Sequence, residues 1–371
     1  MIPKSAKDWL NRIHDIERLR RVRILNVCGG HERTITHSGL RAALPSNVEL
    51  IPGPGCPVCI CPEEDIYEAI QLALNEPVTL VAFGDMLRVP VNVPRGDVRS
   101  LEQARAAGAD IRPIASPMAA LEIARADPDR RVVFFAAGFE TTMAPVAALV
   151  AEGIPDNLTL LLSGRRTWPA VAMLLEGNQA RFDALIAPGH VATVMGSDEW
   201  RFVVERHGIP CAIAGFTPAS LLSALFSVIQ QLLTARPELK NCYTEVVNAC
   251  GNALAKNVLQ RVMRINDASW RGIGVIPASG FELRSDYAAH DARRRLPVGG
   301  NRKRAGQMPP GCDCAAVVLG RISPVECRLY GRACTPRQPV GPCMVSDEGA
   351  CRIWWSNGMR GSGQPSRLNT A

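Results

Sequence analysis

The feature that most constrains the fold is an alternation of short apolar runs and amphipathic stretches. From residue 23 onward, runs rich in β-branched residues end at Gly, Pro or Ser, as buried strands do. Stretches with helical spacing lie between them. Alternation of this kind predicts parallel sheets flanked by helices. The expected strands are RILNV, NVELI, VTLVAFG, IRPIA, RVVFFAA, LTLLL, ALIA and PCAIAG.

The length of 371 residues and the number of expected strands favour two such α/β units in tandem. We predict a first α/β domain at residues 1–125 and a second at 126–240, with their sheets facing a central cleft. Residues 241–371 are expected to hold one long helix at about 244–263, a basic linker and a small irregular C-terminal domain that ends in a disordered tail.

The C-terminal segment is dense in cysteine. Its prolines and glycines exclude a long helix, so either disulfides or a thiolate-bound metal must hold it together. The charged N-terminal segment lacks the apolar region of a signal peptide, and no uncharged apolar run is long enough to span a membrane. We therefore expect a cytoplasmic location, which favours a metal. Six of the 13 cysteines lie here: Cys312, Cys314, Cys327, Cys334, Cys343 and Cys351.

Most of the net charge of +7 comes from residues 292–304, which contain six basic residues and no acidic one. Such a run is typical of a solvated linker, and a docking surface for an acidic partner is the main alternative. A nucleic-acid site is disfavoured because aromatic residues make up only 5% of the chain and none interleaves this run.

Candidate functional residues follow the expected strands directly. In open parallel sheets, ligands bind in the loops at the carboxyl ends of the strands. We expect these loops to line one cleft, because they carry Cys, His, Asp, Glu and Thr. The loops are CGGHE (28–32), PGPGCPVCIC (52–61), Asp85, GFETT (138–142) and PGHV (188–191).

The cysteine loops allow more than one interpretation. Cys28 and His31 are three residues apart and can face one metal ion, although a cysteine that ends a buried strand is ordinarily a small hydrophobic residue. Cys56 and Cys59 form a C-x-x-C, whose spacing suits a reversible disulfide or half of a metal site.

The other two loops have structural alternatives of their own. Glu140 and Thr141 lie at the start of an expected helix. An acidic residue and a threonine at that position can have no role beyond capping the helix. His190 can equally be a satisfied polar group at a strand end.

These motifs, in this order, resemble the HypD family of [NiFe]-hydrogenase maturation factors from Cys28 to Cys351. The resemblance implies a scaffold rather than a conventional turnover enzyme. On it, one iron would receive its cyanide and carbon monoxide ligands to form the Fe(CN)2(CO) moiety. It also implies a HypC-type chaperone, a HypE-type cyanide donor and, indirectly, the hydrogenase large subunit as partners, with neither nucleic acid nor membrane.

The resemblance further implies roles for individual residues. Cys28 would hold the mononuclear iron, with Cys56 and Cys59 beside it. The family's C-x14-C-x6-C-x16-C spacing, which implies a [4Fe-4S] cluster, falls on Cys312, Cys327, Cys334 and Cys351. A redox-active disulfide beside the cluster, similar to that of ferredoxin-thioredoxin reductase, would use Cys314 and Cys343. The full set expected to act in the chemistry is Cys28, Cys56, Cys59, His31, Cys314, Cys343, Glu140, Thr141 and His190.

One position departs from the family. Many members carry CGGHxH, whereas Arg33 replaces the second histidine here, so that histidine cannot be an obligatory iron ligand in this chain. An alternative function is an iron-sulfur-dependent thiol-disulfide oxidoreductase acting on another substrate. It would use the C-x-x-C and the C-terminal cysteines but leave CGGHE and GFETT without a role.

Overall fold

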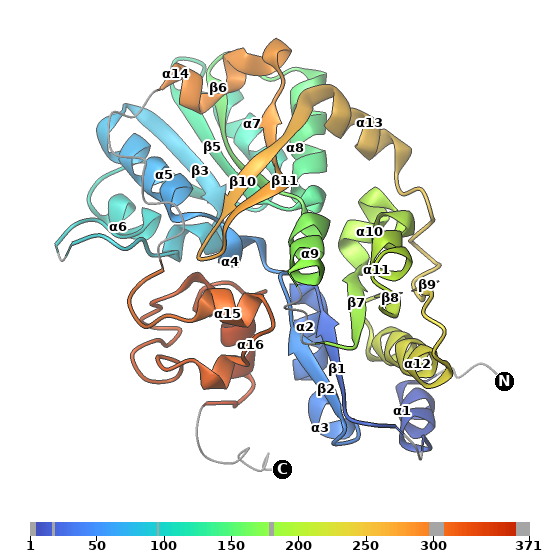
Figure 1. Cartoon of the computed structure of the whole chain (residues 1–371). Coiled ribbons are helices and arrows are strands. Elements are labelled where there is room, and N and C mark those ends of the chain that lie inside the picture. Colours follow the sequence, from blue (N-terminus) through green and yellow to red (C-terminus); the bar gives the residue numbers. More distant parts are fainter. Residues whose placement is uncertain (1–4, 17–18, 95, 178–181, 297–307, 361–371) are drawn as a thin grey trace. The chain divides into compact units, whose positions relative to one another are not determined.

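The computed structural model describes residues 5–16, 19–94, 96–177, 182–296 and 308–360, and its elements are labelled in Figure 1. The chain divides into two compact units that interleave in sequence. The first unit contains Met1–Cys56, Leu174–Ala249 and Pro310–Ala371, and the second contains Pro57–Met173 and Cys250–Pro309.

The first unit is built on a five-stranded parallel sheet with the order β2-β1-β7-β8-β9. Val22 of β1 stands opposite Val48 of β2, and Ile24 stands opposite Ala184 of β7. Apolar runs make the four longer strands because both faces of the sheet are covered. The strands are β1 (Val22–Asn26), β2 (Val48–Pro52), β7 (Ala184–Pro188), β8 (Cys211–Ala214) and β9 (Leu239–Asn241).

Helices pack against this sheet to form the core of the first unit. Thr217 caps α12 through its side chain, and Pro218 occupies the first helical position, where its missing N–H costs nothing. The apolar face of α12 then buries Leu225 and Val228 against the strands, and Phe226 packs on Trp9 of α1. The helices are α1 (Ala6–His14), α2 (Gly29–His37), α3 (Leu40–Ala43), α10 (Gly189–Met195), α11 (Arg201–Glu205) and α12 (Pro218–Thr234).

The second unit contains a six-stranded mixed sheet with the order β10-β11-β6-β5-β3-β4. Its β3–β6 strands are parallel, while β10 and β11 form an antiparallel ribbon that joins the edge of β6 (Figure 1). The strands are β3 (Val78–Phe83), β4 (Ile111–Ile114), β5 (Arg131–Gly138), β6 (Leu158–Arg165), β10 (Met263–Trp270) and β11 (Gly274–Leu283). The helices are α4 (Pro57–Ile60), α5 (Glu63–Asn75), α6 (Leu101–Ala106), α7 (Pro117–Ala126), α8 (Glu140–Glu152), α9 (Thr167–Glu176), α13 (Ala253–Val262) and α14 (Ala292–Arg295).

The cysteine-rich C-terminal region belongs to the first unit and is mostly turns. It contains α15 (Cys314–Val318) and α16 (Ala350–Ser356), with the short 3-10 turns η4 (Pro324–Glu326) and η5 (Pro342–Met344) between them. Gly320 lies against the first sheet, since a Cβ at this position would come 2.9 Å from Cδ1 of Leu25.

The expected α/β class with parallel sheets is confirmed, and every strand expected from the sequence is present. The two units are not consecutive segments of the chain, as the expected domains were. The chain leaves the first sheet after β2, forms β3 to β6 of the second sheet and returns to the first sheet as β7. The CGGHE and PGHV loops consequently share the first sheet, while GFETT lies on the second.

The region after α12 was predicted poorly. The helix expected at 244–263 is wrong over its first half: α13 begins only after Asn252, whose side chain caps it. The chain then enters β10, which pairs with β11 in an antiparallel hairpin, so the second sheet is not purely parallel.

The basic segment is also not simply a solvated linker. Arg293 forms ion pairs with Asp65 and Glu68, which fixes α14 to the second unit. Residues 297–307 and most of the expected disordered tail, at 361–371, lie outside the described residues. No helix in the described ranges is both long enough and apolar enough to cross a membrane.

Candidate functional site

The candidate site lies at the carboxyl edge of the first sheet. From β1 the chain moves to β2 on one side, whereas from β7 it moves to β8 and β9 on the other. The gap between β1 and β7 is therefore the topological switch point, where parallel sheets bind their ligands. The loops that flank it begin at Cys28 and Gly189, and that of β2 begins at Gly53.

The CGGHE and GPGC loops are in direct backbone contact. The amide of Gly29 donates to the carbonyl of Gly55 over 3.1 Å, and the amide of Gly53 donates to the carbonyl of Asn26 over 2.8 Å. A Cβ on Gly55 would lie 2.5 Å from the backbone N and Cα of Cys28. Glycine is therefore required here, and the contact brings the backbone beside Cys56 to Cys28.

Cys28 is the N-cap of α2 and is buried. Burial is the main influence on its thiol and raises its pKa to about 12, while the backbone amides of His31 and Gly30 act in the opposite direction. The carboxylates of Glu348 and Glu32 raise the pKa further. A positive charge bound at this sulfur would reverse the balance, as metal cations do for their thiol ligands.

His31 is fully buried and positioned by both ring nitrogens. Its Nδ1 lies 3.2 Å from Oδ1 of Asn26, and its Nε2 lies 2.9 Å from the carbonyl of Ala214 at the end of β8. Burial lowers the pKa of His31 to about 3. The neutral ring carries one N–H and donates to only one of these oxygens, but both nitrogens lie against protein groups, so the arrangement favours a positioning role over an iron-ligand role for His31.

His190 contacts the same site through Phe216, a residue that the sequence analysis did not select. The His190 ring stacks on Phe216 with centroids 3.8 Å apart, and the His31 ring lies 4.8 Å from Phe216. A Cβ on Gly30 would lie 2.9 Å from the same ring. Phe216 follows β8 as the other site loops follow their strands, and that placement is the signal that could have identified it.

The C-terminal region packs on α2 through buried polar contacts that we call the Glu32 network. Glu32 pairs with Arg41 over 2.8 Å and accepts a 2.6 Å hydrogen bond from Nε1 of Trp354 in α16. Asn26 donates to the second carboxylate oxygen over 3.4 Å. The Arg41 guanidinium also lies over the Trp354 ring, 4.8 Å from its centroid.

A second contact joins the two ends of the first unit. A Cβ on Gly29 would lie 2.5 Å from Cβ of Glu348, so only glycine fits between Cys28 and the C-terminal region. The first residues of CGGHE and the segment that precedes Cys351 are thus in van der Waals contact.

Cys56 and Cys59 form a disulfide at the point in the chain where the first unit ends and the second begins. Both are buried. Cys61, the next cysteine, stays free, and its sulfur lies 3.3 Å from the Ser163 hydroxyl. The C-x-x-C is thus in its oxidised form.

All six C-terminal cysteines are buried, outside any disulfide and close together. The sulfurs of Cys312 and Cys314 are 3.3 Å apart, and electrostatic interactions connect Cys312 with both Cys327 and Cys334. Contacts with Cys314 and Cys351 lower the pKa of Cys343 well below its usual value.

The surroundings of these sulfurs fit a thiolate-bound cluster. Gly341 leaves space beside them, since a Cβ there would lie 2.5 Å from the sulfurs of both Cys312 and Cys314. The Val340 amide donates to the Cys334 sulfur over 3.4 Å, and the Cys351 amide donates to that of Cys343 over 3.3 Å. Such N–H donors stabilise thiolates and cluster sulfurs.

Within the described ranges, no three His, Cys, Asp or Glu side chains are grouped as the ligands of a single metal ion. A cubane does not need such a group, because its four irons each take a separate thiolate. The six-cysteine cluster is therefore consistent with a metal cofactor held by thiolates.

Glu140 and Thr141 lie in the second unit, at the end of β5. Glu140 is fully buried and accepts from the Thr167 amide over 2.7 Å and from its hydroxyl over 2.8 Å. Thr141 is not an N-cap, because Phe139 holds that position without a side-chain hydrogen bond. Burial raises the pKa of Glu140.

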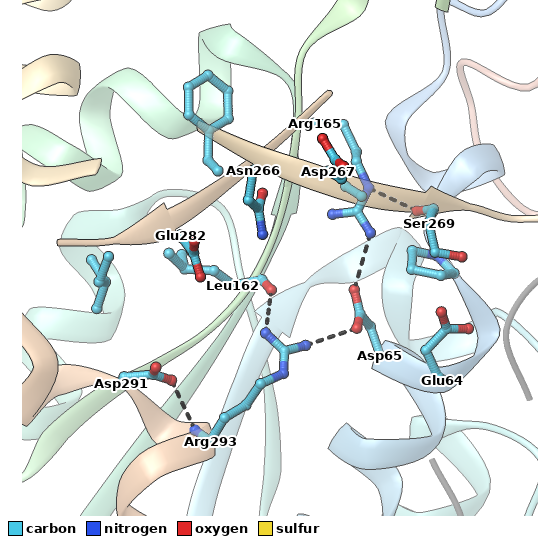
Figure 2. A pocket seen from close by; sticks show the side chains of 14 residues that line it. Glu64, Asp65, Leu162, Arg165, Asn266, Asp267, Ser269, Glu282, Asp291 and Arg293 are labelled. Carbon is cyan, nitrogen blue, oxygen red and sulfur yellow. Dashed lines mark hydrogen bonds and ion pairs between the residues drawn. The ribbon is translucent and has the colours of Figure 1, made fainter. Parts of the chain in front are cut away.

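The second unit also contains a polar pocket of about 310 Å³ (Figure 2). Asp65 lies between Arg165 and Arg293, with contacts of 3.4 and 2.7 Å. Figure 2 shows that both guanidiniums point toward this carboxylate, so their charges are already used within the protein.

The fold and the site together define a class: an α/β protein whose clustered thiols suit a metal cofactor. The family model described as "HypD: Hydrogenase formation hypA family" matches residues 4–358. This chain therefore belongs to the HypD family of hydrogenase maturation factors.

Individual relatives agree with that assignment. The "Hydrogenase maturation factor HypD" of Azotobacter vinelandii is 41% identical over 349 residues, covering 91% of this chain and 90% of the relative. Proteins of the same name from Rhodobacter capsulatus and Escherichia coli are 40% and 39% identical over 342 residues, covering 91% of this chain and 89% of each relative.

Proposed function

We propose that this protein is the scaffold on which the Fe(CN)2(CO) moiety of a [NiFe]-hydrogenase is assembled, with Cys28 as the thiolate that holds the iron. The observation that carries the proposal is the contact of Gly55 with the Cys28 backbone at the switch point of the first sheet. It places the C-x-x-C loop beside a cysteine whose sulfur receives helix N-terminal amides.

Iron is the substrate of this site, and a soft thiolate retains it while other positions exchange ligands. Cys56 and Cys59 become available as further ligands, or as a source of two electrons, only when their disulfide is reduced. His31 and Phe216 then fix the wall of the site rather than bind the metal. Glu140 and Thr141 in the second unit, and His190 in the first, remain candidates for the assembly chemistry.

For the C-terminal region, we propose that Cys312, Cys327, Cys334 and Cys351 hold a [4Fe-4S] cluster. When bound, the cluster supplies single electrons. Cys314 and Cys343 are in contact and can form the neighbouring disulfide that accepts them. The proposed partners are a HypC-type chaperone, a HypE-type cyanide donor and the hydrogenase large subunit, all in the cytoplasm.

The test is anaerobic copurification with a HypC-type chaperone, followed by infrared spectroscopy of the cyanide and carbonyl stretching region. We expect bands that disappear in Cys28→Ala and persist in Cys211→Ala, in which a buried cysteine of β8 outside the site is removed. Bands that survive Cys28→Ala would refute the assignment of the iron to Cys28. A protein that reduces generic disulfides but binds no mononuclear iron would instead be the alternative thiol-disulfide oxidoreductase.

A further inference from the structure

The C-terminal region has a pocket that neither the iron site nor the disulfides use. It has a volume of about 410 Å³ and includes three arginines and one cysteine among its lining residues. We call it the Arg pocket, and it is lined by Val325, Glu326, Cys327, Arg328, Tyr330, Gly331, Arg332 and Arg360.

The Arg pocket carries positive charge that an acidic partner can bind. Arg328 and Arg332 are exposed, and neither forms an ion pair within the described part of the chain. Arg360 lies over the Trp355 ring, 5.4 Å from its centroid, an arrangement that leaves its N–H groups free for other acceptors. Glu326, the one acidic residue among the described lining residues, is used locally because it accepts from the Ser323 amide over 2.6 Å.

One residue of the six-cysteine cluster also lines the pocket. Cys327 is one of its lining residues, although the remaining cysteines of the region are not. Val325 adds an apolar side chain that is 41% exposed. A small apolar contact surrounded by arginines matches the weak interfaces of electron-transfer proteins, which bury little area and rely on charge for encounter.

Reduction of the disulfides requires electrons from a donor outside this protein. Reducing one disulfide, at Cys56–Cys59 or at Cys314–Cys343, consumes two electrons and two protons. A cluster passes one electron at a time, so two encounters with a one-electron carrier are needed per disulfide. On each encounter, the carrier is oxidised and the cluster is reduced.

We propose that the Arg pocket is the docking site of an acidic one-electron carrier protein, which delivers electrons to the cluster at Cys327. The inference rests on the proposed cluster. Arginine guanidiniums match carboxylates in a fork geometry, so the expected partner surface carries clustered Asp and Glu. Residues 361–371 contain no Asp or Glu side chain, so this tail supplies no such carboxylate cluster.

The experiment uses the full chain and an oxidised acidic plant-type [2Fe-2S] ferredoxin as the probe, with binding measured by calorimetry at several salt concentrations. We expect Arg328→Glu/Arg332→Glu to weaken binding by at least about tenfold and to flatten its salt dependence. The matched control is Arg206→Glu/Arg236→Glu, which makes the same charge change at exposed arginines of the first unit outside the pocket.

The outcomes separate this inference from the proposed function. Three results would each overturn the docking site. The first is an equal loss of ferredoxin affinity in both double variants, and the second is unchanged affinity in the pocket variant. The third is binding of inorganic phosphate without binding of ferredoxin. Iron, acid-labile sulfide and reduction by methyl viologen radical report the cluster independently of docking. Absence of a cluster would refute the proposed function, while the calorimetric comparison would still decide the charge of the docking surface.

Discussion

The Glu32 network gives the sharpest prediction, because it connects the helix that begins at the proposed iron site with the C-terminal region. We consider Arg41→Ala. The side chains of Arg41 and Glu32 are only 14% and 3% exposed, so the substitution leaves a buried carboxylate without its cation. The Trp354 and Asn26 hydrogen bonds to Glu32 remain.

The magnitude follows from these contacts. Removing one partner of a buried ion pair costs about 3–5 kcal/mol. The two remaining donors and the partial exposure of Arg41 reduce this to about 2 kcal/mol, and the lost stacking on Trp354 adds about 0.5–1 kcal/mol. We therefore expect Arg41→Ala to lower the free energy of unfolding by about 3 kcal/mol.

The assay is urea unfolding of the full chain, followed by circular dichroism and tryptophan fluorescence. Arg20→Ala is the matched control, because Arg20 pairs with Asp183 at the same distance of 2.8 Å but is 70% exposed. Its removal should cost less than about 1 kcal/mol. Adding Glu32→Gln to Arg41→Ala should recover about 1–2 kcal/mol, since the uncompensated charge disappears. Equal costs for the two arginine variants, or no recovery by Glu32→Gln, would refute the reasoning.

Three further predictions concern other parts of the site. Gly55→Ala should lower the free energy of unfolding by about 1–3 kcal/mol and impair iron binding, because the added Cβ would meet the Cys28 backbone. Gly84→Ala is the control and should leave iron binding intact, because its added Cβ would meet nothing within 4 Å. Parallel thermal melts and iron titrations check both variants. Gly341→Ala should lower cluster content after anaerobic reconstitution, measured as iron and acid-labile sulfide, and full occupancy would contradict it. Glu140→Ala should cost about 2–4 kcal/mol in thermal unfolding by leaving the two Thr167 donors unpaired, and a loss below 1 kcal/mol would count against this account.

The strands of both sheets could be predicted because each is a short apolar run closed by turn residues, and that local signal is strong. Their grouping could not. Whether β7 pairs with β1 or with β6 depends on contacts between distant segments, for which periodicity contains no information. The helix expected from residue 244 fails only in its first half, because residues 244–252 form turns and bends that lead to the Asn252 cap, and apolar spacing does not show where such a helix begins.

The cysteines were identifiable by spacing, but their surroundings were not. Phe216, Trp354 and Arg41 carry no motif, and they reach the site only because the loop after β8, α16 and α3 pack on the CGGHE helix. Glycines give the partial exception. A glycine can mark a close backbone approach, but the sequence does not show that Glu348 approaches Gly29 or that the Cys28 backbone approaches Gly55.

The contacts of α2 connect the CGGHE motif at its start with the C-terminal region. Its first turn supplies amides to Cys28, its Glu32 bonds to Trp354, and α16, which contains Trp354, also carries Cys351 in its first turn. Two contacting helices therefore separate the proposed iron ligand from a proposed cluster ligand. Packed interiors resist deformation, and the interface of α16 with α2 contains a buried carboxylate. The Glu32 network makes this packing specific, because sliding of one helix past the other would leave that carboxylate unpaired.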